Sequence, residues 1–130
     1  MDRFFLGLAG VYGALAVGMG AFGAHALKAR LAELPDGVER LAWWDTAASY
    51  HLIHALALGL AAWAIAAFPG RGSVLSGWCF AGGTLIFSGS LYAMTLSGAR
   101  WLGAVTPIGG SLLIVGWTAI AWSAWRGAAG

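Results

Sequence analysis

The sequence has few charged residues. Only 9% of its 130 residues are Asp, Glu, Lys or Arg, whereas soluble domains typically contain about 25%. The seven basic residues do not form a run, so the usual sequence signatures of a nucleic-acid surface and of a polybasic lipid-binding segment are missing. We therefore expect no nucleic-acid partner.

Cysteine is nearly absent as well. Cys79 is the only one, which excludes an intramolecular disulfide and a zinc site built from cysteines. The chain also lacks a polar segment long enough for a soluble domain, because its longest polar connection covers only residues 28–40.

Apolar residues, in contrast, make up 60% of the chain and give a mean hydropathy of +0.78. They form four runs, each long enough for a helix to cross a hydrocarbon core of about 30 Å. Lipid offers no hydrogen bonds, so each span must satisfy its own backbone, which favours helices. The sequence predicts an all-α integral membrane four-helix bundle, a single transmembrane domain over residues 1–130 with spans at about 4–27, 41–68, 74–96 and 101–125.

The connections predict the topology. Residues 69–73 and 97–100 are short turns, which make the spans that they join antiparallel. We expect up-down topology with both termini on one side of the membrane. Gly98 is placed to end the third helix, and Ser73 to cap its start. Pro107 is expected to open or kink the fourth.

Residues 28–40 predict a short interfacial helix between spans one and two. Leu27, Leu31 and Leu34 recur there at helical spacing beside charged residues. Asp36 followed by Glu39 resembles a capping box at the start of the second span.

Small and aromatic residues suggest how the spans pack. Gly10, Ala14 and Gly18 repeat every four residues in the first span, as do Ala16, Gly20 and Ala24, and such spacing lets helices approach closely. We expect this packing to be intramolecular, with a homo-oligomer face as the alternative.

Two aromatic belts are expected at the membrane surfaces, comprising Trp43, Trp44 and Trp101 on one side and Phe4, Phe5, Phe68, Trp78, Trp122 and Trp125 on the other.

Polar residues of all four spans converge in one leaflet, next to the first loop. Ionisable groups at such depth face a bundle interior or a wet cavity. The candidates for a polar pocket are His25, Tyr50, His51, His54, Ser88, Ser90, Tyr92 and Thr106. The other leaflet offers no polar path, which weakens a transporter interpretation.

The histidines are expected to be neutral imidazoles bonding across helices. A haem or metal site on His25, His51 and His54 is the alternative, but no carboxylate accompanies them at depth. We expect no cofactor and no metal. Residues 87–91 lack the first glycine of a nucleophile elbow, so we expect no catalytic residue and no enzyme.

Several sequence blocks resemble the DUF 423 family of YgdD-like and transmembrane protein 256-like small membrane proteins. These blocks are GAFGAHAL at 20–27, TAASYHLIHALAL at 46–58, FSGSLY at 87–92, LGAVTPIGG at 102–110 and GW at 116–117. The resemblance implies a four-span protein of the bacterial plasma (inner) membrane and assigns no catalytic residue. It places His25, Tyr50, His54, Ser88, Ser90, Tyr92, Thr106 and Pro107 within the blocks.

The leading functional hypothesis is a non-enzymatic accessory, assembly or structural subunit in the membrane, which would contact the lipid bilayer and a membrane-protein partner or further copies of itself. The small size and the absence of an extramembrane domain motivate it. A small-solute or proton binding or transport protein that uses the polar pocket is the alternative, and a haem- or metal-binding redox protein is the third hypothesis.

Overall fold

The computed structural model describes residues 1–127, and these residues are almost entirely helical, without a strand. The chain belongs to the all-α class predicted from the sequence. Its elements are α1 (Asp2–Phe22), the π-helical turn η1 (Gly23–Leu27), α2 (Lys28–Leu31), α3 (Gly37–Ala67), α4 (Arg71–Ser97), the 3₁₀ turn η2 (Arg100–Ala104) and α5 (Thr106–Gly127).

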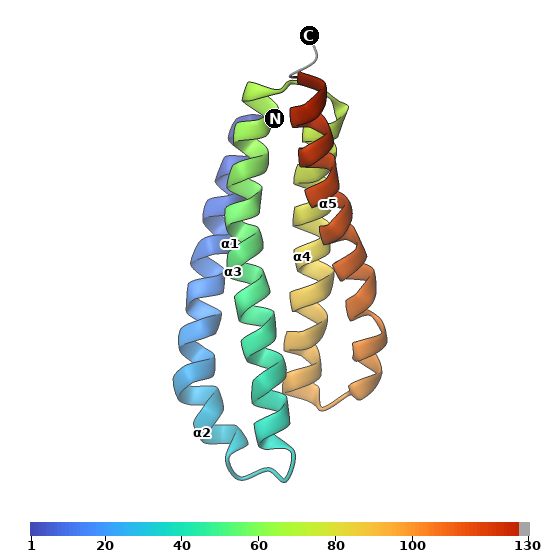
Figure 1. Ribbon diagram of the computed structural model, residues 1–130. Coiled ribbons are helices and arrows are strands. Elements are labelled where there is room, and N and C mark those ends of the chain that lie inside the picture. Colours follow the sequence, from blue (N-terminus) through green and yellow to red (C-terminus); the bar gives the residue numbers. More distant parts are fainter. Residues whose placement is uncertain (128–130) are drawn as a thin grey trace.

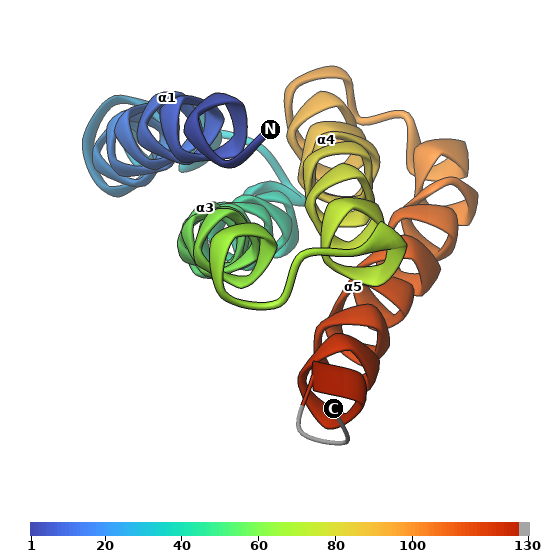
Figure 2. The ribbon, with the colours of Figure 1, turned by 90° about the horizontal axis from the view of Figure 1, so that it is seen from above.

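The long helices run up and down, with the N-terminus and the end of α5 at the same end of the bundle (Figure 1). α1 packs on α3, α3 on α4 and α4 on α5. Figure 2 shows that α1 and α5 lie on opposite sides of this arrangement, with α3 and α4 between them. The predicted four-helix, up-down architecture is confirmed, and α4 is its most buried span.

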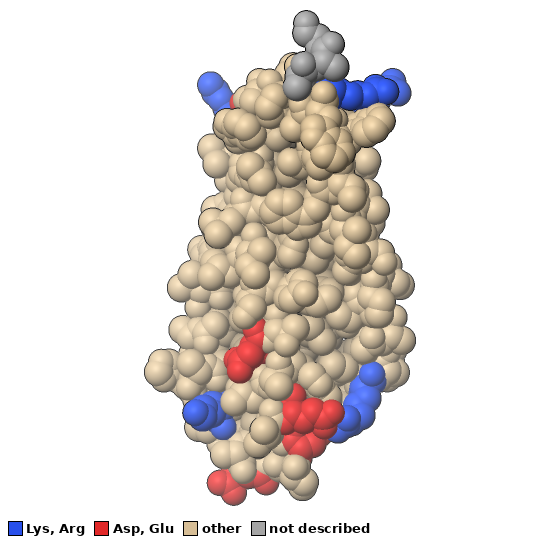
Figure 3. Space-filling view, in the orientation of Figure 1, with Lys and Arg blue, Asp and Glu red and all other residues tan. Residues whose placement is uncertain are grey.

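Four helical segments are long and apolar enough to cross a membrane: Asp2–Leu31, Gly37–Ala67, Arg71–Ser97 and Arg100–Gly127. On the face drawn in Figure 3, charged side chains gather toward the two ends, and a broad uncharged band separates them. This band is the part of the surface that suits a hydrocarbon core.

The helix ends agree with the local signals only in part. Gly98 ends α4 in a left-handed conformation with φ 73°, and Pro107 lies in the first turn of α5, both as predicted. The predicted side-chain caps at Asp36 and Ser73 are wrong. Asp36 makes no capping hydrogen bond, and Ser73 Oγ donates instead to the Phe68 carbonyl at 2.6 Å.

The helical segment predicted after the first span is present but short. α2 follows α1 directly through η1, and it ends at Leu31. Leu27 and Leu31 are buried, whereas Leu34 is exposed. The apolar side of this segment therefore contributes to the core of the bundle.

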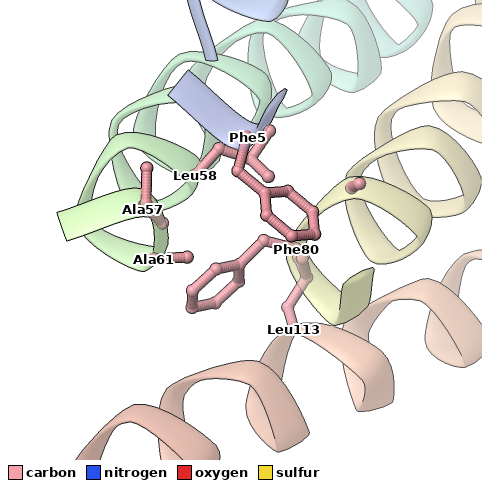
Figure 4. Close-up of a cluster of buried hydrophobic side chains, with 8 residues drawn as sticks. Phe5, Ala57, Leu58, Ala61, Phe80 and Leu113 are labelled. Atoms are coloured by element: carbon pink, nitrogen blue, oxygen red, sulfur yellow. The ribbon is translucent and has the colours of Figure 1, made fainter. Parts of the chain in front are cut away.

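The core is formed where large side chains meet glycines. Phe5, Ala57, Leu58, Ala61, Phe80 and Leu113 bring together α1, α3, α4 and α5 (Figure 4). A Cβ added to Gly77 would lie 2.6 Å from the Phe5 ring, and one on Gly116 would lie 2.6 Å from the Phe80 ring. Any residue larger than glycine at these two positions would therefore clash with the aromatic ring that packs on it.

The small residues of α1 behave differently from the prediction. Gly10, Ala14 and Gly18 are exposed on the outside of the bundle. A Cβ added to Gly10 or Gly18 would have no neighbour within 4 Å. The expectation that this repeat packs within the chain is therefore wrong, because α1 uses its opposite side, with Phe5 and Ala16, to contact the bundle.

We predict that Gly109→Ala destabilises the protein by about 1–3 kcal/mol. The new Cβ would collide with the backbone nitrogen of Phe87 and lie 2.8 Å from the Gly83 carbonyl oxygen, so α5 would have to move away from α4. Unfolding followed by circular dichroism in mild detergent would measure the loss.

Gly110→Ala is the matched control. Its Cβ would lie 3.6 Å from the Phe87 ring, which is an ordinary contact, and the mid-helix glycine is a weaker helix former than alanine. If both variants have the same free energy of unfolding, close backbone approach does not determine the α4–α5 contact.

Candidate functional site

The predicted polar residues mostly join helices to one another. Apart from His25 and Tyr50, each forms a side-chain hydrogen bond to a neighbouring helix. His51, His54, Ser88, Ser90 and Tyr92 are buried, Thr106 is half-buried, and His25 and Tyr50 are exposed.

His54 of α3 has a partner at both ring nitrogens. Nδ1 lies 2.8 Å from the Tyr50 carbonyl oxygen, and Trp117 Nε1 of α5 donates to Nε2 at 3.3 Å. A carbonyl only accepts and an indole only donates, so these partners specify the neutral tautomer with its proton on Nδ1. His54 therefore connects α3 to α5, and its imidazole has no free nitrogen for a ligand.

His51 connects three helices. Its Nδ1 lies 3.2 Å from Tyr92 Oη on α4. Its ring also lies edge-on to Tyr12 of α1, with ring centroids 5.4 Å apart. Tyr12 Oη in turn donates to the Ala81 carbonyl at 3.1 Å. The imidazole and two phenols thus tie α1, α3 and α4 together.

The hydroxyls make shorter links from α4. Ser88 Oγ donates to the Ala47 carbonyl of α3 at 2.8 Å, and Ser90 Oγ lies 2.8 Å from Thr106 Oγ1 of α5. Ser88 and Ser90 have no hydrogen bond to a described histidine. The arrangement therefore contains no serine–histidine pair of the kind that activates a nucleophile.

Tyr50 lies at the edge of this network, and His25 lies outside it. Tyr50 stacks on His54 and on Phe87, with ring centroids 5.8 Å and 4.3 Å apart, but it is 41% exposed. His25 lies in the π-helical turn and is exposed. The structure thus brings the other predicted residues together and leaves His25 outside.

Trp44 is an important residue that the sequence interpretation misplaced. It was expected in an aromatic belt, but it is only 1% exposed. Its Nε1 donates to the carbonyl of Met19 at 2.7 Å, in the last turn of α1 before η1. Gly23 leaves the room that the indole ring fills, since a Cβ there would collide with it. The glycine was the available signal, but a π-helical turn has no clear pattern in the sequence.

An ionic network closes the end of the bundle near the first loop. The Arg100 guanidinium forms a bidentate salt bridge with Glu39, in which Nη1 donates to Oε1 at 2.8 Å and Nη2 donates to Oε2 at 2.7 Å. It also lies over the Trp43 ring, 5.2 Å from the ring centroid. Arg40 donates to the carbonyls of Thr95 and Leu96 at 2.7 and 3.0 Å. These contacts fasten the start of α3 to the end of α4 and to η2.

No group of three His, Cys, Asp or Glu side chains within residues 1–127 is placed to hold a metal ion. Two surface grooves of the described chain lie elsewhere, since none of the eight predicted polar residues lines them. The site is thus a set of inter-helix hydrogen bonds.

Comparison with known proteins shows the family of this chain. The family described as "Protein of unknown function (DUF423)" matches residues 19–110. The chain belongs to this family. The matched region of the DUF423 chain contains η1, Trp44 and all eight predicted polar residues.

Curated relatives agree with this assignment. The chain is 40% identical to the UPF0382 membrane protein YwdK of Bacillus subtilis, over 91% of this chain and 93% of the relative. It is 39% identical to the UPF0382 inner membrane protein YgdD of Escherichia coli K12, over 89% of this chain and 85% of the relative. These names state a membrane location and no enzymatic activity. No solved structure matches the chain significantly.

We predict that His54 and Trp117 are energetically coupled. A double-mutant cycle with His54→Leu and Trp117→Phe, measured by unfolding in detergent, should give a coupling free energy of about 0.6–1.7 kcal/mol, the range found for hydrogen bonds between membrane helices. Strictly additive single effects would contradict the hydrogen bond between α3 and α5.

Proposed function

We propose that this protein is a non-enzymatic accessory or assembly subunit that packs against a transmembrane helix of another membrane protein. The observation that carries the proposal is the unfilled outer face of α1, defined here as Gly7, Gly10, Ala14, Gly18 and Ala21.

These five residues form a single stripe. They follow one another at intervals of three or four residues and are all exposed, so they lie on one side of the helix. The buried residues of α1, Phe5 and Ala16, lie on the opposite side. A Cβ placed on Gly7, Gly10 or Gly18 would meet no atom within 4 Å.

Glycine in the middle of a helix lowers its stability by about 1 kcal/mol relative to alanine. Contact with lipid tails alone does not require small residues, because lipid adapts to large side chains. A second helix does benefit from them, because small residues let two backbones approach and increase their van der Waals contact. The stripe is therefore suited to a helix from outside the chain.

The charge at its first end favours a different chain over a second copy. Arg3 continues the stripe at a four-residue interval and is exposed. Two copies inserted in the same direction would place Arg3 against Arg3 about a two-fold axis, and such a like-charge pair is unfavourable. A partner with an acidic or neutral residue at this depth fits better.

The alternative hypotheses have less support from the geometry. A solute or proton pathway would use the predicted polar residues. Both ring nitrogens of His54 already have hydrogen-bond partners. The hydroxyls of Ser88, Ser90 and Thr106 are hydrogen-bonded to each other or to a backbone carbonyl. A haem or metal site would require His25, which is exposed in η1, and the three histidines do not form a group that could hold a metal ion within residues 1–127. The name of the Escherichia coli relative supports insertion in the inner membrane, where both termini would lie on one side.

The test is a native mass spectrum of the tagged protein extracted from its own membranes. We expect the 13.4 kDa chain to carry a second, different polypeptide in a fixed ratio. Gly10→Leu combined with Gly18→Leu should remove that polypeptide, because leucines prevent the close approach of a second helix, and a Cβ at either position meets nothing within the chain.

Gly13→Leu is the control, since Gly13 lies on α1 outside the stripe and a Cβ there also has no neighbour within 4 Å. The proposal is wrong if the second polypeptide stays bound to the Gly10 and Gly18 variant, or if the chain associates only with copies of itself.

A further inference from the structure

Two grooves flank the start of α4, at the end of the bundle that carries both termini. The first, of about 1010 Å³, lies between α4 and α5 and includes Val115, Trp122 and Arg126. The second, of about 660 Å³, is lined by Ile65, Val74 and Trp78 among others. Arg71 and Leu75 line both grooves and form the ridge between them.

The charge of this region is positive. Arg71 and Arg126 both line the first groove, and no carboxylate of the described chain lines either groove. Neither arginine forms a salt bridge with a residue in the range 1–127. Arg126 lies over the Trp122 ring at 4.8 Å. This differs from the other end of the bundle, where Arg40 and Arg100 are paired with Asp36 and Glu39.

Close packing brings the start of α4 next to the end of α5. Gly72 lies against Ser123, and a Cβ at Gly72 would collide with the Ser123 hydroxyl. At the last turn of α5, a Cβ on Gly127 would lie 2.7 Å from the Phe68 ring. The start of α4 and the end of α5 are therefore adjacent, so Arg71 and Arg126 face the same groove although they are far apart in the sequence.

Exposed tryptophans indicate that the grooves face the membrane interface. Trp78 and Trp122, which line them, are 52% and 54% exposed, and exposed tryptophans near the ends of spanning helices are typical of that region. From the arginines each groove continues along apolar side chains, toward Val115 in the first and along Val74 to Trp78 in the second.

We propose that this region binds one anionic phospholipid, with its phosphate between Arg71 and Arg126 and one acyl chain in each groove on either side of Leu75. Guanidinium groups form paired hydrogen bonds with phosphate oxygens. The apolar walls below them suit acyl chains. A free phosphate would use the arginines but would leave those walls empty, so the combination selects a lipid.

Native mass spectrometry of the full chain in mild detergent tests the proposal. Added phosphatidylglycerol should be retained in preference to phosphatidylcholine with the same acyl chains. Arg71→Gln combined with Arg126→Gln should weaken phosphatidylglycerol binding by about fivefold for each arginine removed, or about 25-fold in total. Lys28→Gln combined with Arg30→Gln removes the same charge outside the grooves and should leave binding unchanged.

Thr118→Trp provides an independent variant. Thr118 is exposed on α5 and lines the first groove, so the indole should displace an acyl chain and reduce lipid retention while both arginines remain. If the circular dichroism spectrum shows that the double arginine variant does not fold, the Thr118→Trp variant tests the lipid-binding proposal. Equal retention of both lipids, or displacement of phosphatidylglycerol by millimolar inorganic phosphate alone, would overturn the proposal.

Discussion

The helices of this bundle come close together where an aromatic ring of one helix lies against a glycine of the next. Phe5 meets Gly77, Phe80 meets Gly116, and Trp44 meets Gly23. In lipid the hydrophobic effect does not drive helices together, so association depends on this kind of tight contact and on hydrogen bonds between helices. Each glycine removes the side chain that would keep two backbones apart, and each ring fills the space that results.

The polar residues depend on this close packing. Ser88 reaches the Ala47 carbonyl, and Trp44 reaches the Met19 carbonyl, because the backbones that carry these acceptors are near. A buried hydroxyl or imidazole without a partner is costly in lipid, so the pairs also fix how each helix is rotated. Thr84 is the exception among the described residues, since its buried hydroxyl has no partner.

Local signals in the sequence predicted the fold, but not the partners of individual side chains. Apolar run length, the left-handed Gly98 and Pro107 at the start of α5 depend on neighbouring residues alone. Trp44 and Ser73 were misjudged because their positions depend on other parts of the chain. The same limit applies to the outer face of α1, since a four-residue repeat shows that small residues share a side and not which side faces the bundle.

The two surfaces that remain unfilled lie on different sides of the bundle. The helices α1 and α5 lie on opposite sides of the bundle (Figure 2), and the larger of the two grooves is lined by residues of α4 and α5. A helix bound at α1 would therefore leave the arginines of that groove accessible to lipid. A bound phospholipid would in turn hold together the ends of α4 and α5, where α5 has α4 as its main neighbour. Lipid would then stabilise α5, which lies on the opposite side of the bundle from a partner helix bound at α1.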